Sequence, residues 1–484
     1  MKIEISGIAT GTVYFMVAQL VFMVSGYIIN VGVGRLLGPA MYGIFGVVIA
    51  LMTVLNVFMT AGIPQSASKL ISEGRSVGDV KKSAVKMQSL LTFIVFVAYL
   101  GLAGFIAAAF GDVSLTPHIQ LSALLIPMYG FSAIYLSFFN GEGRFEQQAA
   151  LTTLCSIIKV VSVFGLIFAG FGVFGAILGY GLGQIAGFVW AFLIYRGING
   201  KAGLEKEMIK FATPVILFSM VSAFLMSADL FFVKALMANN TQAGIYTAAS
   251  TLGRIPYYIL VALGISIFPA ISKATSSKNH ELTKKYIRNS MRYLVLLLAP
   301  ITLLISATSG QLVKMFYTSI YVSAGDPLAI QCIGFAFMTL FTVLNSVIMG
   351  SGRPKVSAAI TVTLIPIAVI SNIMLIPVYG LSGAATATLI MGIVGFVLSA
   401  GYVKQRFGAL IPLASTVKII TASLVVFIIA YYAKLGGLLL VAEYAALLAL
   451  NFGILWLLRE VNRDDLKLIS KMPGIGLLSR MIPE

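Results

Sequence analysis

The chain has few charged residues, and this shortage narrows what it can be. Charged residues make up 10% of its 484 positions, whereas hydrophobic residues make up 59%. A typical water-soluble domain carries about 25% charged residues and hides its apolar residues in a core of limited size. The mean hydropathy of this chain is +1.00. The composition therefore predicts a membrane protein.

Cysteine and histidine are also scarce, with 2 residues of each. Cys155 and Cys332 both lie inside apolar segments, so we expect small buried core residues rather than a disulfide. His118 and His280 stand alone in separate loops, without companions at metal-ligand spacing. The sequence therefore predicts no metal site.

Long apolar runs are abundant instead. A helix needs about 20 mostly apolar residues to cross a bilayer, and long uninterrupted runs favour helices over barrel strands. We predict an all-α polytopic membrane protein with 14 transmembrane helices, the first of them retained rather than cleaved as a signal peptide. The expected spans lie near 8–31, 40–63, 88–111, 119–140, 147–170, 173–195, 209–236, 243–270, 291–309, 325–349, 355–376, 381–403, 411–434 and 437–459.

The positions of Lys and Arg predict the orientation of these spans, because short basic loops stay in the cytoplasm. With the N-terminus inside, most of the 33 Lys and Arg residues fall in predicted cytoplasmic loops and in the tail. We therefore expect a multi-pass protein of the cytoplasmic (inner or plasma) membrane with both termini in the cytoplasm. The same bias accounts for a basic net charge of +17, so no nucleic-acid partner is expected.

The chain contains a long internal repeat. The phrase "NGEGRFEQQAALTT" at 140–153 returns as "MGSGRPKVSAAITV" at 349–362, with Gly141, Gly143 and Arg144 matching Gly350, Gly352 and Arg353. Downstream, "FGVFGA" at 171 pairs with "YGLSGA" at 379, and upstream "YGIF" at 42 pairs loosely with "GIY" at 244. A repeat of about 200 residues therefore spans most of the chain.

Each copy holds six predicted helices, an even number, so the two copies are related by an axis along the membrane normal. We predict an N-lobe at 1–200 with helices 1–6, a C-lobe at 201–404 with helices 7–12, and helices 13–14 with a cytoplasmic tail at 405–484. Two such parallel six-helix lobes form a central cavity that rocking opens alternately to each side. This is the architecture of a transporter.

The repeated Gly-X-Gly-Arg phrase falls where a span ends at the cytoplasmic face. We interpret its glycines as permitting a tight turn and its arginine as a cation that anchors the turn to lipid phosphates. A phosphate-cradling loop is disfavoured, because the phrase lacks the preceding strand and the following Lys-Ser/Thr.

Charged residues inside the spans cost about 2.5 to 3.5 kcal/mol each, so they usually face a bundle interior and mark a pathway. Lys159 is central in span five, and Arg254 is central in span eight just before Pro256. We predict that both contact an anionic head group. For Arg254, the alternative is a structural ion pair with Asp229. Lys234 and Arg35 lie near the outer ends of spans seven and one, where snorkelling is an equal alternative to substrate binding.

Asp229 is the one carboxylate deep in the first twelve predicted spans. It is a candidate for binding a coupling cation, for titrating, or for compensating the charge of Arg254. Cations outnumber acids in this interior, and a cavity of that sign attracts anions.

In its predicted spans, its internal repeat and its cationic interior, the chain resembles the polysaccharide flippases of the multidrug/oligosaccharidyl-lipid/polysaccharide exporter superfamily. The likeness is carried by "GRLLGPAMYGIF", "ATPVILFSMVSAFLMSADLFF", "AGIYTAASTLGRIP" and "PVYGLSGAATAT", in that order. It implies Wzx-type export, in which a polyprenyl-diphosphate-linked oligosaccharide passes from the cytoplasmic to the outer leaflet. It also implies no cofactor beyond a coupling cation, Na⁺ or H⁺, and partners among glycan-assembly proteins.

Two other functions stay open. A cation-coupled drug or metabolite exporter of the same superfamily is one, although residues 8 to 31 lack the acid that such exporters often carry in helix one. A membrane glycan polymerase or glycosyltransferase is the other. It is disfavoured because the predicted outer loops are short and offer only Asp112 and Asp326 as carboxylates. We therefore expect a flippase rather than an enzyme.

Overall fold

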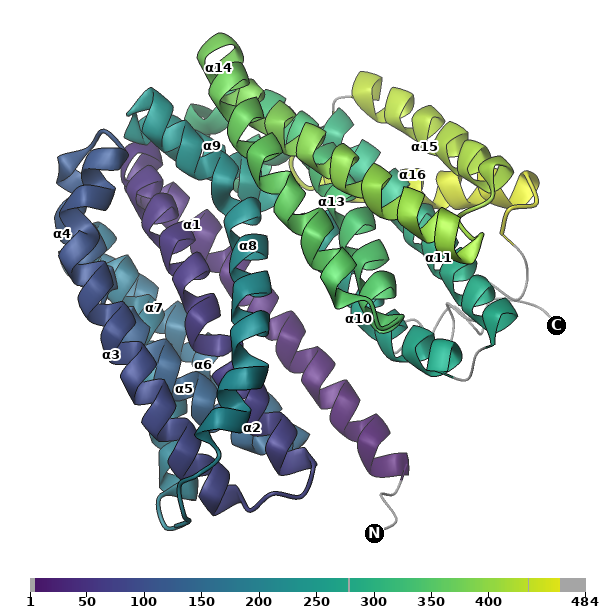
Figure 1. Ribbon diagram of the computed structural model, residues 1–484. Coiled ribbons are helices and arrows are strands. Elements are labelled where there is room, and N and C mark those ends of the chain that lie inside the picture. The colour runs from purple at the N-terminus through teal and green to yellow at the C-terminus, as the bar shows by residue number, and fades with distance from the viewer. Residues whose placement is uncertain (1–4, 277–278, 434, 462–484) are drawn as a thin grey trace. The chain divides into compact units, whose positions relative to one another are not determined.

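The computed structural model describes residues 5–276, 279–433 and 435–461, and these residues contain helices and connecting loops but no β-strand (Figure 1). The chain divides into two compact units, Met1–Ala248 and Ala249–Glu484. The predicted lobe boundary at 200/201 concerns the sequence repeat and stays a prediction.

The first unit is built from helices that run from α1 to the first part of α9. They are α1 (Ile5–Thr60), α2 (Ile63–Ser72), α3 (Val77–Ala109), η1 (Val113–Leu115), α4 (Thr116–Ser122), α5 (Leu125–Gly141), α6 (Phe145–Leu166), η2 (Ile167–Phe171), α7 (Gly172–Tyr195), α8 (Glu205–Met237) and α9 (Asn240–Gly253).

The second unit begins within α9 and continues through the remaining helices. They are α10 (Ile255–Ser276), α11 (His280–Ala307), α12 (Ser309–Phe316), η3 (Ser319–Ala324), α13 (Gly325–Gly350), α14 (Pro354–Phe407), α15 (Leu413–Ala433) and α16 (Leu439–Leu457).

Ten helical segments of the described chain are long and apolar enough to cross a membrane, so the protein is a polytopic membrane protein. Three of them are much longer than one crossing, at 56, 51 and 54 residues. Each contains a break where a glycine adopts a positive φ. The break lies at Gly38 in α1 (φ 76°), at Gly172 after α6 (φ 52°, ψ −131°) and at Gly380 in α14 (φ 56°, ψ −131°).

The chain reverses direction at each of these breaks. Arg353 and Tyr402, at opposite ends of α14, share a hydrogen bond of 2.8 Å, whereas a straight helix would hold them about 70 Å apart. Tyr42 donates to Asn30 at 3.3 Å across the break in α1. The pairs of spans predicted at 8–31 and 40–63, 147–170 and 173–195, and 355–376 and 381–403 therefore fold as helical hairpins.

Close glycine contacts hold the α6–α7 hairpin together. A Cβ atom on Gly179 would lie 2.6 Å from the backbone of Val163, and one on Gly183 would lie 2.4 Å from the carbonyl oxygen of Cys155. The later of these two α7 residues meets the earlier of the two α6 residues, so the two helices are antiparallel. Only glycine permits backbones to approach this closely.

The repeated Gly-X-Gly-Arg phrase forms the same turn in both copies. Gly143 and Gly352 have φ values of 73° and 80°, and each follows the end of a helix. The backbone N–H of the next residue donates to a carbonyl five residues earlier, at 2.9 Å for Arg144 and 3.3 Å for Arg353. This is the Schellman pattern of helix ends, so the predicted turn is confirmed.

Corresponding residues of the two copies meet inside the first unit, where α1 packs against α9. A Cβ atom on Gly43 would lie 1.9 Å from the carbonyl oxygen of Asn240, and one on Gly244 would lie 1.9 Å from that of Pro39. The contact is reciprocal, because Gly43 and Gly244 are partners in the sequence repeat and each meets the residue four positions before the other.

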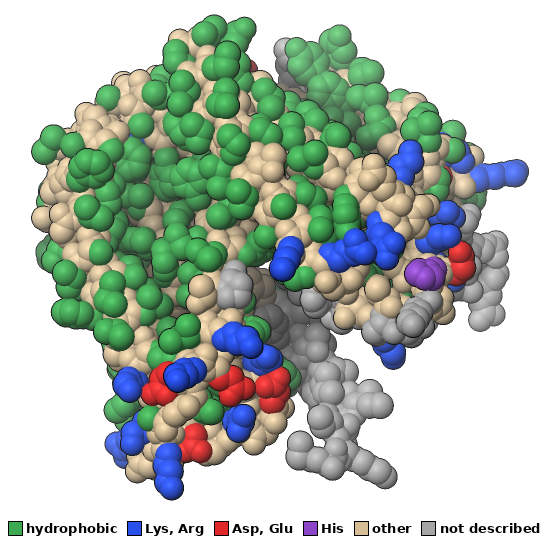
Figure 2. Space-filling model, viewed as in Figure 1, with side chains coloured by type: hydrophobic (Ala, Val, Ile, Leu, Met, Phe, Trp, Pro, Cys, Tyr) green, Lys and Arg blue, Asp and Glu red, His purple; other side chains and the backbone are tan. Residues whose placement is uncertain are grey.

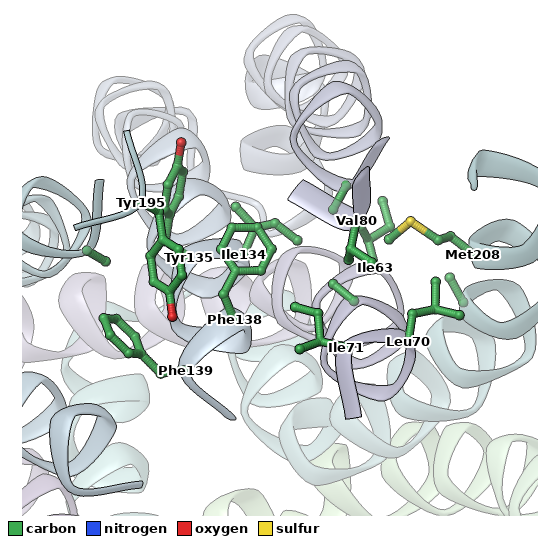
Figure 3. Close-up of a cluster of buried hydrophobic side chains, with 14 of the residues drawn as sticks. Ile63, Leu70, Ile71, Val80, Ile134, Tyr135, Phe138, Phe139, Tyr195 and Met208 are labelled. Atoms are coloured by element: carbon green, nitrogen blue, oxygen red, sulfur yellow. The ribbon is translucent and has the colours of Figure 1, made fainter. Parts of the chain in front are cut away.

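Charged side chains of the first unit gather at one end of its helices, and hydrophobic side chains cover the rest of the face shown in Figure 2. Next to that end lies a cluster of buried hydrophobic side chains from α2, α3, α5, α6, α7 and α8, part of which Figure 3 shows. The hydroxyl of Tyr195 in this cluster donates to Glu142, and the guanidinium of Arg144 lies 5.3 Å from the centre of the Phe139 ring. The cluster therefore fixes the first Gly-X-Gly-Arg turn.

Some helix boundaries differ from the predicted spans. The span predicted at 243–270 is two helices, because α9 ends at Gly253 and α10 begins at Ile255. Helices α3 and α11 begin at Val77 and His280, well before the spans predicted at 88 and 291. The basic turns at their starts are too polar for a hydrocarbon core, yet they continue the same backbone hydrogen bonding.

Candidate functional site

Lys159 on α6 is a buried cation held by aromatic rings. The side chain is 3% exposed, and its ammonium nitrogen lies 4.7 Å from the centre of the Phe22 ring and 5.0 Å from that of Tyr180. Within the described residues it donates no hydrogen bond and has no carboxylate within 4.0 Å. The two rings contribute about 0.5 to 2 kcal/mol each, less than the several kcal/mol that burying an ammonium costs.

The local sequence explains why an aromatic ring reaches this lysine. Gly183 on α7 faces Lys159, and a Cβ atom there would lie 3.0 Å from the Cβ of the lysine. The absence of a side chain lets α7 approach α6 closely, and Tyr180, one turn earlier on α7, then covers the ammonium. Phe22 of α1 also covers the ammonium. An anion placed beside Lys159 would supply the charge that the protein itself omits.

Arg254 lies between α9 and α10 in the second unit, at the point where the helix is interrupted before Pro256. Its guanidinium carbon lies 5.2 Å from the centre of the Phe335 ring on α13. One turn before Arg254, Ser250 accepts a hydrogen bond of 2.8 Å from Gln331, which also belongs to α13. These contacts seat the arginine against α13, and its predicted contact with a head group stays a prediction.

Asp229 on α8 is 3% exposed and belongs to the first unit. One of its oxygens accepts from the backbone N–H of Leu230 at 2.8 Å, and the other accepts from the Tyr246 hydroxyl of α9 at 2.9 Å. The carboxylate therefore links α8 to α9. Its roles as an ion-coupling or charge-compensating group stay predictions.

Lys234 has two polar partners in the first unit. The side chain is fully buried, and its ammonium donates to Asp112 at 2.7 Å and to Asn240 at 2.6 Å. Asn240 in turn donates to the same oxygen of Asp112 at 2.8 Å. This Asp112–Lys234–Asn240 triad connects the loop after α3 to α8 and α9. Such closed pairing favours a structural role, and the predicted substrate contact of Lys234 stays a prediction.

The triad also sets the charge of Asp112. Burial alone would raise the pKa of this carboxyl group, but hydrogen bonds from Lys234, Ser114 and Asn240 outweigh it and lower the pKa to about 2. Asp112 is therefore ionised throughout the neutral range and matches the buried ammonium. Sequence reasoning treated Asp112 only as a loop carboxylate, because its partner lies 122 residues away in the chain.

Arg35 is exposed on α1, three residues before the break at Gly38. The structure thus places Lys159, Asp229, Lys234 and Arg35 in the first unit and Arg254 in the second. The aromatic partners of Lys159 were also missed by sequence reasoning, because a phenyl ring in an apolar helix carries no signal of its own. The described part of the chain contains no group of three or more His, Cys, Asp or Glu side chains that could hold a metal ion.

Comparisons with known proteins relate the chain to two families of membrane proteins. The chain matches the family model described as polysaccharide biosynthesis protein over residues 8–275 and the MatE family model over residues 214–378. The probable low-salt glycan biosynthesis flippase Agl15 of Haloferax volcanii is 23% identical over 382 residues, which cover 77% of this chain and 78% of that protein. The lipid II flippase MurJ of Bacillus subtilis is 23% identical over 403 residues, which cover 72% of this chain and 74% of that protein.

A solved structure of a lipid II flippase MurJ in an inward closed conformation superimposes with a TM-score of 0.77. It is 16% identical and covers 92% of this chain and 99% of that one. This likeness shows that the two proteins share a fold over nearly their whole length.

Proposed function

Because the chain belongs to the polysaccharide biosynthesis protein family, we propose that it is a flippase for a polyprenyl-diphosphate-linked oligosaccharide. The substrate moves from the cytoplasmic to the outer leaflet by alternating access through a cationic central cavity. Relatives named as glycan and lipid II flippases support the class of transport. The diphosphate at the head of such a lipid is the anion that a cationic cavity selects.

The buried ammonium of Lys159 is the observation that carries this proposal. A cation that is 3% exposed and faces only aromatic rings is costly to the folded protein. A phosphate oxygen is a strong acceptor for an ammonium group, and the faces of Phe22 and Tyr180 leave the nitrogen oriented without neutralising it. The site is therefore suited to a ligand that arrives with its own negative charge and leaves again.

The transport path that we propose has 14 crossings in two parallel six-helix lobes, with the last two helices outside the repeat. Ten apolar helical segments, three glycine reversals and the α9–α10 pair support this count. We place the protein in the cytoplasmic membrane with both termini in the cytoplasm. A coupling cation, Na⁺ or H⁺, drives the cycle, Asp229 and Arg254 line the path, and glycan-assembly proteins supply the substrate.

The proposal is tested by transport in vesicles that contain a lipid-linked oligosaccharide in the inner leaflet. Lys159→Met removes the charge but keeps an unbranched side chain between the two rings. Lys314→Met is the matched control, because Lys314 is an exposed lysine with no carboxylate within 4.0 Å among the described side chains. We expect flipping to fall at least about tenfold in the first variant, the equivalent of one charge-assisted hydrogen bond, and to be unchanged in the second.

Thermal unfolding of the same two proteins separates a functional from a structural lysine. Lys159→Met should unfold at the same or a higher temperature than the native chain, because it removes a buried charge without breaking an ion pair. Flipping at the native rate by Lys159→Met would remove this residue from the mechanism. An unaltered chain that moves no lipid-linked sugar would refute the function itself.

A second candidate function is cation-coupled export of a drug or metabolite. The match of residues 214–378 to the MatE family model favours it, and that segment includes Asp229. Uptake of a cationic dye into inverted vesicles, abolished by Asp229→Asn, would support export. If the native chain takes up no dye, export is excluded and flipping is the remaining candidate function.

A further inference from the structure

The second unit contains a small pocket where several helix ends meet. They are the end of α10, the start of α11, the turn before α14 and the end of α14. The pocket has a volume of about 80 Å³, which is room for several water molecules and so for one small oxyanion. Its lining includes two arginines, Arg353 and Arg406, and His280. The hydroxyls of Thr283 and Ser351 also line it and donate to backbone carbonyls, at 2.9 Å to Asn279 and 2.7 Å to Ile348. Among the described residues that line the pocket there is no carboxylate.

The two arginines are both related to Tyr402 on α14. Arg353 donates from one guanidinium nitrogen to the hydroxyl of Tyr402 at 2.8 Å. Arg406 is one helical turn beyond Tyr402 on α14, so the same face of the helix presents it. A guanidinium group has five N–H donors, and this bond uses one of them. Arg353 is thus anchored in place with most of its donors still available.

The surroundings of the pocket are also positively charged. A wider groove of about 580 Å³ shares Asn279 with it and is lined by Lys284, Lys285 and Arg288 of α11. The one carboxylate in that groove, Glu281, pairs with Lys284 at 2.9 Å. Figure 2 shows Lys and Arg side chains gathered over this part of the second unit, where α10 ends and α11 begins in Figure 1. A pocket within such a surface attracts anions.

The first copy of the repeat provides an internal comparison. The residue that corresponds to Ser351 is Glu142, and its carboxylate lies 3.4 Å from the guanidinium of Arg144. The turn is the same in both copies, but only the first neutralises its arginine with an adjacent acid. The second copy replaces that acid with a serine hydroxyl, which leaves Arg353 able to bind an anion.

We propose that this pocket binds a phosphate group through Arg353 and Arg406. The group belongs either to an anionic lipid headgroup or to dissolved phosphate. Both are present at the face where the loops of this pocket are predicted to lie. The site is distinct from Lys159, and binding to it is measured without transport, so it stands or fails independently of the proposed flippase activity.

Two arms test the site and distinguish the sources. In the first, the purified full-length chain in neutral detergent is titrated with inorganic phosphate at constant ionic strength set by chloride, and binding is followed by thermal unfolding. In the second, native mass spectrometry measures retention of phosphatidylglycerol against phosphatidylcholine after extraction from nanodiscs with equal parts of both lipids. The variants are Ser351→Glu, which installs the acid of the first copy, and Arg353→Gln. Arg144→Gln is the control.

We expect at least one arm to show saturable binding that Ser351→Glu and Arg353→Gln weaken about tenfold or more, while Arg144→Gln matches the native chain. If the variants bind more weakly in the first arm alone, the ligand is dissolved phosphate. If they bind more weakly in the second arm, the ligand is a lipid headgroup. Arg406→Gln, at the second arginine, should weaken the same binding even if a variant at Ser351 or Arg353 fails to fold. Equal behaviour of the native chain and these variants in both arms, or no binding by the native chain in either, overturns the proposal.

Discussion

The ion pair between Asp112 and Lys234 is the contact of the first unit whose removal should have the clearest effect. The ammonium of Lys234 is fully buried, whereas the side chain of Asp112 is 14% exposed. Asp112→Asn therefore leaves a buried cation without its anion, at a cost of about 3 to 5 kcal/mol. Lys234→Met leaves a carboxylate that still has Asn240 and Ser114 as donors, and we expect a smaller loss of about 1 to 2 kcal/mol. The double variant should recover part of the loss of Asp112→Asn.

The same pair predicts a dependence of stability on acid. The pKa of Asp112 is about 2 in the folded chain against a usual 3.8, so ionisation of this group stabilises the folded state by about 2 kcal/mol above pH 4. Because the folded pKa is the lower one, this stabilisation is lost as the pH falls from about 4 through 2. Asp112→Asn has no proton to take up there and should lack this part of the acid sensitivity.

Thermal unfolding of the purified chain in one detergent, at neutral pH and at several steps between pH 5 and pH 3, measures both effects. A loss of 3 kcal/mol corresponds to a fall in Tm of about 6 °C or more for a unit of this size. Asp326→Asn is the control, because Asp326 is exposed and has no ion-pair partner among the described residues. A Tm for Asp112→Asn that equals that of the native chain, or an unchanged acid sensitivity, would refute the reasoning.

Three further changes test other contacts. Gly244→Ala would place a Cβ atom 1.9 Å from the carbonyl oxygen of Pro39, so we expect loss of the monodisperse protein in size-exclusion chromatography. Glu460→Gln breaks a pair in which Arg292 donates to Glu460 at 2.8 Å with little exposure on either side, and it should lower stability by about 3 to 5 kcal/mol in thermal unfolding. Glu443→Leu should raise Tm, because both oxygens of that buried carboxylate lack a hydrogen-bond partner among the described residues.

The helical hairpins and the repeated turn could be predicted from the sequence because both depend on local properties. Apolar run length decides where a helix can cross, and the glycines at positions such as 172 and 380 mark where the chain can reverse. Gly143 and Gly352 have positive φ for the same reason, and the sequence repeat indicated that both copies would use them. Hydropathy does not show where a helix continues beyond the bilayer, which is why the predicted spans did not include the first turns of α3 and α11.

The partners of the candidate residues could not be predicted, because they depend on how the helices are rotated against each other. The sequence singled out Lys159 by its charge, but the covering rings of Phe22 and Tyr180 come from helices far away in the chain. Likewise, Lys234 was recognised as a cation near a helix end, and its partner Asp112 was recognised only as a loop carboxylate. Long-range ion pairs of this kind leave no pattern in a single sequence.

The reciprocal contact of Gly43 and Gly244 has a consequence for which residues each copy of the repeat can carry. Each glycine touches the residue four places before the other, as the same residue does on both sides of a symmetric homodimer. A side chain added at either position would press against the backbone of the helix from the other copy. Each copy therefore limits which residues the other can accept here, and neither glycine can be replaced without a matching change in the facing helix.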